Sequence, residues 1–141
     1  MIAVPEIVME IRKIIEIPDE LNKRYSKLAM GLPDCQAEDG LWHTVLDRQD
    51  YYKETSGSAG IASGFIKAVK SRMLDPSYLA VSRLTLESVL KLITSEGKVT
   101  GVSGGTAVKA TVEDYNRVRI CPTLYGQGLT VQLLIESILT E

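Results

Sequence analysis

A helical repeat of apolar residues at the start of the chain constrains the fold most strongly. Apolar residues recur there at intervals of three and four from Val4 to Ile15, and charged residues fill the intervening positions. This spacing predicts an amphipathic helix, which Ile17-Pro18 ends because the residue before a proline is pushed out of the helical region. Asp19 suits a helix N-terminus and begins a second helix that extends to about Leu32. So short a connection favours an antiparallel hairpin.

Three more helices are predicted further along the chain, over about residues 55–73, 75–94 and 125–139. Thr55 or Ser56 is a suitable N-cap for the first of them. That helix carries three glycines on one face, each costing about 1 kcal/mol relative to alanine. We therefore expect that a neighbouring helix approaches closely there, or that the glycine face lines a pocket.

The helices alternate with irregular loops, and short extended pieces are predicted within these loops, at 41–46 and 99–102. The strand–helix–strand order of a parallel sheet is missing, so the expected class is all-α, built from helical hairpins in a single domain over residues 1–141. The long loops after the second and fourth helices should lie at the same end of the hairpins. Loops gathered on one face of a helical scaffold are where a binding site is usually built.

Composition excludes several classes of protein and site. The 141 residues carry a net charge of −2 without a basic cluster, which excludes a nucleic-acid partner, and the apolar runs are too short to cross a membrane. Cys35 and Cys121 are far apart, which favours two reduced cysteines in a cytoplasmic protein. With one histidine, His43, and scattered cysteines, we expect neither a metal site nor a cofactor.

Five segments carry groups that could suit a binding site, and each also has a simpler explanation. Trp42 is either a core residue or an aromatic platform in a cleft, and His43 is a weak candidate for an acid or base because no partner is evident. Asp47, Asp50 and Glu54 resemble the paired carboxylates of glycosidases, although a solvated loop with local ion pairs explains them better.

The remaining candidates lie at helix starts and in a glycine-rich turn. Residues 54–58 place a carboxylate and three hydroxyls at a helix N-terminus, either as a cap or as a polar ligand site. Residues 125–128 repeat that design, where capping and close packing are the alternative to ligand contact. Residues 101–106 form a tight turn rather than a phosphate loop, because the required Gly-Lys-Ser/Thr ending is missing.

Four motifs together resemble one family, the unsaturated rhamnogalacturonyl hydrolases, which are relatives of the unsaturated glucuronyl hydrolases. The segment 40–47 resembles the family's GLW…VLD motif, and 54–59 resembles its E-[AT]-S-[AG]-S-A helix start. The segment 99–106 resembles VTGVCxGT, and 125–128 resembles HGxG with Tyr125 in place of the histidine. The order and spacing agree over about residues 4–140.

This resemblance implies a toroid of six helical hairpins, of which the chain would form the C-terminal part. It also implies removal of unsaturated uronic acid residues from pectin-derived or related disaccharides. In that reaction an aspartic acid protonates the C4=C5 double bond, water adds at C5, and the resulting hemiketal opens, without a metal. The family's catalytic aspartate lies upstream of the matched part, so no catalytic residue is carried over to this chain.

The sequence therefore predicts part of a glycoside hydrolase that is inactive alone, with an oligosaccharide as its ligand. The expected sugar contacts are Trp42, Glu54, Ser56, Thr106, Tyr125 and Gln127. The alternative is a non-catalytic helical module for protein association or carbohydrate binding. An incomplete toroid would expose an apolar flank, so we expect a homodimer or a partner that carries the N-terminal half.

Overall fold

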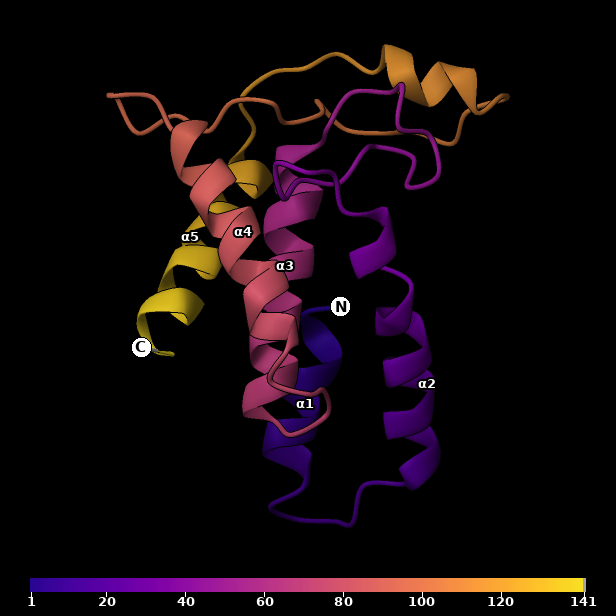
Figure 1. The fold of residues 1–141 in the computed structure, drawn as a ribbon, viewed down its shortest axis with the longest axis vertical. Helices are drawn as coiled ribbons and strands as arrows, with labels where there is room; N and C mark the ends of the chain where they lie inside the picture. The colour runs from indigo at the N-terminus through magenta and orange to yellow at the C-terminus, as the bar shows by residue number, and fades with distance from the viewer. Residues whose placement is uncertain (141) are drawn as a thin grey trace.

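The computed structural model describes residues 1–140, which form five α-helices and two 3-10 helices joined by loops. The elements are α1 (Ala3–Ile11), α2 (Asp19–Met30), η1 (Pro33–Cys35), α3 (Thr55–Lys70), α4 (Tyr78–Lys91), η2 (Glu113–Arg117) and α5 (Leu124–Ile138). Successive α-helices alternate in direction, so the loops after α2 and α4 meet at one end (Figure 1). Extended segments within residues 1–140 form only isolated bridges. The predicted all-α class with short β pieces in loops is confirmed.

All five predicted helices are present, and three of them, α1, α3 and α4, end at least three residues earlier than predicted. Helix α1 stops at Ile11, and Ile14 and Ile15 in the following turns are 84% and 57% exposed. Because these side chains find nothing to pack against, no burial rewards another helical turn. Helix α3 stops at Lys70 because Arg72 adopts a left-handed conformation with φ of +59°.

Helix α3 lies at the centre of the molecule and is buried along most of its length (Figure 1). Each of the three apolar core clusters includes residues of α3. In one of them the Phe65 ring meets the rings of Trp42 and Tyr78 edge-on, with centroid distances of 6.2 and 4.9 Å. The other helices are therefore arranged around α3, and its N-terminus faces the loop end.

The three glycines of α3 differ in what lies next to them. A Cβ at Gly64 would lie 2.7 Å from the Met1 Cβ, which is too close for any real pair of atoms. A Cβ at Gly60 would make ordinary contacts with Ile2 at 3.6 Å and Leu129 at 3.7 Å. Gly57 instead borders the depression described below. A close approach is therefore found at Gly64, but the segment before α1 makes it and not a neighbouring helix, whereas Gly57 lines a depression as the alternative expectation had it.

Helices α1 and α2 run antiparallel, but they pack largely through α3 rather than directly against each other (Figure 1). Val8 of α1 and Tyr25 of α2 share a core cluster with Ala68 of α3. The Tyr25 hydroxyl lies 3.0 Å from the carbonyl oxygen of Met1 and 3.3 Å from that of Gly64. The direct helix hairpin expected here is therefore wrong in its packing, because α3 supplies the buried surface for both helices.

Large apolar side chains remain exposed on the outer faces of α1 and α5. Ile7 of α1 is 53% exposed, and Ile138 at the end of α5 is 71% exposed. Leu133 of α5 is fully buried, but the apolar side chains further along this helix are largely exposed. Among residues 1–140, no helix combines the length and the apolar character that crossing a bilayer requires.

Candidate functional site

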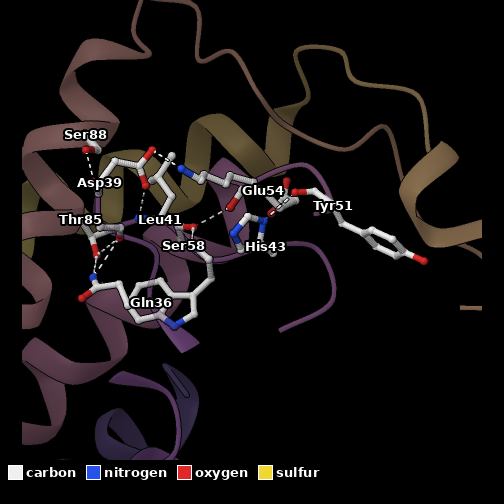
Figure 2. Close-up of polar contacts among 12 residues, drawn as sticks. Gln36, Asp39, Leu41, His43, Tyr51, Glu54, Ser58, Thr85 and Ser88 are labelled. Atoms are coloured by element: carbon white, nitrogen blue, oxygen red, sulfur yellow. Dashed lines mark hydrogen bonds and ion pairs between the residues drawn. The ribbon is translucent and has the colours of Figure 1, made fainter. Parts of the chain in front are cut away.

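The loop between η1 and α3 is held against α4 by hydroxyl side chains of α4 that belong to none of the motifs in the sequence. Ser88 donates a hydrogen bond to the carbonyl of Asp39, and the Thr85 hydroxyl donates to that of Gly40 at 2.8 Å (Figure 2). Gly40 has a φ of +86°, and a Cβ there would lie 2.6 Å from the backbone of Leu84. The loop thus sits directly on α4, and only glycine fits at the contact.

The buried face of α4 differs from the one that its apolar residues suggest. Leu84 and Leu90 share the helical spacing of the leucines in this segment, but they are 38% and 50% exposed. Ser82, Thr85 and Ser88 are buried instead, alongside Val89. Their short hydroxyl side chains allow the loop and α3 to approach, and each hydroxyl donates a hydrogen bond to a backbone carbonyl of one of these two segments.

Glu54 joins the two long loops at the N-terminus of α3. Its carboxylate accepts hydrogen bonds from the Gly57 backbone N–H, from the Ser56 hydroxyl at 2.8 Å and from the Ser103 N–H at 2.9 Å. The N-cap of α3 is therefore Glu54, not Thr55 or Ser56 as predicted. A carboxylate suits this position because it accepts several donors and lies at the positive end of the helix dipole.

The second loop, between α4 and α5, packs against the same helix end. The Thr55 N–H donates to the Gly101 carbonyl at 3.0 Å, and Gly101 has a φ of +71°. Ser103 forms an isolated antiparallel bridge with Ile120. The predicted gathering of both long loops on one face is therefore confirmed, with α3 as the element that they share.

A depression of about 380 Å³ lies where these loops meet the N-terminus of α3. Its lining combines an imidazole, hydroxyls and a carboxylate with apolar and aromatic side chains. The residues are Trp42, His43, Thr44, Leu46, Glu54, Gly57, Ser58, Ile61, Ser103, Thr106 and Tyr115. A concave site with a few polar groups among apolar ones is typical of a small-ligand site.

Three of the six predicted sugar contacts line this depression, but only Thr106 has an exposed side chain. Trp42 is 1% exposed, and its indole N–H donates to the Leu32 carbonyl at 2.7 Å. The ring is thus part of the core and presents no face to a ligand, so an aromatic platform does not fit this position. The Glu54 carboxylate is occupied by the bonds described above.

The other three predicted contacts hold the loops in place. The Ser56 hydroxyl donates to Glu54. The Tyr125 hydroxyl bonds the Ser103 carbonyl and accepts from the Gly105 N–H at 2.9 Å. The Gln127 amide accepts from the Val99 N–H at 2.6 Å and donates to the Gly97 carbonyl at 2.9 Å. These side chains therefore shape the loops that border the depression instead of lining it.

Charged side chains next to the depression form local pairs. Arg48 lies 3.0 Å from Asp50 and covers the Tyr51 ring at 4.2 Å, and this arginine lowers the pKa of Asp50 below its usual range. At Asp39 burial opposes ionisation, but hydrogen bonds from Lys53 and from a backbone N–H prevail and lower the pKa. The solvated loop with ion pairs is therefore the better description of Arg48 and Asp50, whereas Glu54 is the N-cap of α3. Within residues 1–140, no three acidic, histidine or cysteine side chains gather as a metal site would require.

His43 was a weak candidate in the sequence, and this residue lines the depression. It is 8% exposed, and its Nδ1 lies 2.6 Å from the Tyr51 carbonyl (Figure 2). Its partner is a backbone carbonyl eight residues away, which no pattern of side chains reveals. The position of a lone histidine directly after a buried tryptophan was the one available signal.

Comparison with known proteins places these features in a wider group. A family profile described as Glycosyl Hydrolase Family 88 matches residues 1–140. The unsaturated rhamnogalacturonyl hydrolase YesR of Bacillus subtilis is 38% identical over 114 residues, which is 79% of this chain and 31% of that protein. The chain therefore spans about a third of the length of this curated relative.

Solved structures agree with the family match. A possible member of the GH105 family from Klebsiella pneumoniae superposes with a TM-score of 0.92 at 27% identity, covering 99% of this chain and 37% of that one. A similar protein from Salmonella enterica gives a TM-score of 0.91 at 28% identity, again covering 99% and 37%. The predicted fold, part of an α/α toroid, is confirmed. The profile match over residues 1–140 shows that this chain belongs to glycosyl hydrolase family 88.

Proposed function

We propose that this chain supplies part of the sugar-facing surface of a hydrolase that removes unsaturated uronic acid residues from pectin-derived or related disaccharides. The supporting observation is its 38% identity over 114 residues with an unsaturated rhamnogalacturonyl hydrolase. The reaction would be hydration of the C4=C5 double bond, with the general acid on a segment outside these 141 residues. Alone, the chain is expected to be inactive.

Within this function the predicted contact residues take two roles. Thr106 is proposed to touch the sugar, because its side chain is exposed at the depression. Glu54, Ser56, Tyr125 and Gln127 are proposed to act as positioning residues, because their polar atoms hold loop backbone or one another. Binding specificity would then depend on the shape of the loops as much as on direct contacts.

A chimeric enzyme tests this function. This chain would replace the matching segment of the Bacillus subtilis relative, and turnover of an unsaturated galacturonyl-rhamnose disaccharide would be followed as loss of the double bond's ultraviolet absorbance. We expect turnover by the chimera, and none by the isolated chain or by the relative with that segment deleted. A folded chimera without turnover, or an active isolated chain, would contradict the proposal.

The exposed apolar faces favour an association role alongside this function. Ile7 and Ile11 of α1 and Ile135 and Ile138 of α5 are between 37% and 71% exposed, which is unusual for a chain that works alone. We propose that these faces pack against a partner with the N-terminal half of the toroid, and that the isolated chain covers them by forming a dimer. Light scattering in dilute solution tests the dimer, and a clean monomer would count against it.

A further inference from the structure

Helices α1, α3 and α5 form one layer of the molecule, which is open at both edges. All three run away from the loop end, and α3 packs against both of the others (Figure 1). Helices α2 and α4 run in the opposite direction. Beyond α1 on one edge and α5 on the other, residues 1–140 supply no further helix to this layer. Each edge therefore has a helix with one side left without a neighbour.

The two edge helices carry matching apolar stripes on these sides. On α5, Val131, Ile135 and Ile138 are spaced by four and three residues and are between 50% and 71% exposed. The one charged side chain of α5 is turned toward α3, so no charge interrupts this stripe. On α1, Ile7 and Ile11 are four residues apart and are 53% and 37% exposed. Each stripe is of the kind that a helix buries against a neighbour.

An ion network places the two stripes at the same height in the layer. Lys67 of α3, whose side chain is 4% exposed, lies 2.6 Å from Glu6 of α1 and 3.7 Å from Glu136 of α5. Because both glutamates reach one ammonium group, they lie level with each other. Ile7 follows Glu6 in the chain, and Ile135 precedes Glu136. The two isoleucines are therefore level to within about one helical turn.

A second copy of the chain matches both edges at once. Rotation about an axis parallel to the helices changes no heights, so a twofold axis in this direction brings Ile7 of one copy level with Ile135 of the other. The helix directions match as well, since α3 already packs in parallel against α1 and α5. The chain covers 37% of the Klebsiella pneumoniae relative, so two copies fit within one turn of an α/α toroid.

We infer that two copies of this chain close into a ring, with α5 of each copy packed in parallel against α1 of the other. Each contact pairs Ile7 and Ile11 of one copy with Val131, Ile135 and Ile138 of the other, and the twofold axis repeats it. This inference rests on the association role proposed above and adds which faces meet and in which direction. The alternative dimer has a single antiparallel contact, of α1 with α1 or of α5 with α5.

Disulfide cross-linking between copies distinguishes these arrangements. The native thiols are removed by Cys35→Ser and Cys121→Ser, and Ile7→Cys and Ile135→Cys are then introduced into separate chains. Under mild oxidation, an equal mixture of the two chains should form a covalent dimer, in up to half of the molecules. Neither chain alone should do so, because each new thiol then faces an isoleucine.

A charge within the contact tests the same surface without any cross-link. Ile135→Glu should raise the dissociation constant of the dimer at least tenfold in analytical ultracentrifugation. Leu28→Glu is the matched control, because Leu28 is 59% exposed on α2, outside the proposed contact. That variant should dimerise as the parent chain does. Circular dichroism checks the fold of both variants, and the cross-links decide the matter if Ile135→Glu does not fold.

Three outcomes would overturn the inference: a covalent dimer from either cysteine chain alone, assembly that continues beyond two copies, or a parent chain that stays monomeric. The first outcome rejects this pairing and keeps the association role, whereas a monomer rejects both. Equal weakening of the dimer by Leu28→Glu would also count against the assigned faces. The chimera tests the hydrolase function independently, because turnover there requires no contact between two copies of this chain.

Discussion

Replacing Glu54 with glutamine should destabilise the chain by removing the carboxylate that joins its two loops. One carboxylate oxygen, Oε2, accepts from the Gly57 N–H, and the other, Oε1, accepts from the Ser103 N–H at 2.9 Å. A glutamine side chain has a single acceptor oxygen, so its NH₂ group must face one of these two backbone donors. In either orientation one backbone N–H loses its partner.

The magnitude follows from these contacts. A hydrogen bond to a charged group contributes about 1.5–3 kcal/mol, and the negative charge at the N-terminus of α3 adds about 0.3–1 kcal/mol. Glu54→Gln should therefore lower the free energy of unfolding by about 2–4 kcal/mol. For a domain of this size that corresponds to a fall in melting temperature of roughly 6–16 °C.

Urea and thermal unfolding followed by circular dichroism measure this effect, with Glu38→Gln as the matched control. Glu38 lies on the same loop, and its side chain is exposed. That control should change stability by no more than about 0.5 kcal/mol. If Glu54→Gln unfolds within 1 °C of the parent chain, Glu54 does not join the loops, and the carboxylate becomes a candidate for direct ligand contact.

Three further predictions concern the packing around α3. Gly101→Ala should cost more stability than Gly97→Ala in urea unfolding. Both glycines have positive φ, a strain of about 1–2 kcal/mol for alanine, but only at Gly101 would the new Cβ overlap the first residue of α3. Burial raises the pKa of Tyr25 to about 12. The stability that the protonated Tyr25 hydroxyl contributes is complete below the unfolded pKa near 10 and is lost as the pH rises through about 12. The urea midpoint should therefore fall over that interval, and it should fall less in Tyr25→Phe. The Lys67 side chain is 4% exposed and lies 3.7 Å from Glu136, so Lys67→Ala should lower the melting temperature more than Lys67→Met, which keeps the packing of the stem. The reasoning on the glycines is contradicted if Gly101→Ala and Gly97→Ala lose equal stability. That on Tyr25 is contradicted if the urea midpoints of the parent chain and Tyr25→Phe fall equally with pH, and that on Lys67 if both lysine variants lower the melting temperature equally.

The helices were predictable because periodicity reports on burial along a whole element. Val4 to Ile11 repeat the apolar spacing and do form α1, but Ile14 and Ile15 continue the same spacing without being buried. Periodicity shows which face of a helix seeks a partner. It does not show whether the chain supplies one, and here the surface ends before the pattern does.

The site was harder to predict because its geometry depends on backbone groups. Thr85 and Ser88 look like solvent-facing residues in the sequence, yet they are buried by the carbonyls of a turn more than forty residues away. Trp42 and Tyr125 were predicted to contact a sugar, but their polar atoms form hydrogen bonds with backbone groups. The sequence motifs mark the loops that border the depression. Which of their side chains line it and which hold the loops in place is visible only in the three-dimensional structure.

Glu54 both caps α3 and holds the loop at Ser103, so the part of the depression next to this helix is rigid. That part cannot move without breaking the cap of α3, whereas the outer border of the depression, beyond Gly105, is held less firmly. Beyond Gly105 the chain makes fewer contacts, and Val108 is 96% exposed. Regions with so few contacts open at little cost in free energy. Sugars should therefore differ in affinity mainly by how far each one orders the loop segment beyond Gly105. Sugars that bind more tightly should show a larger loss of entropy on binding.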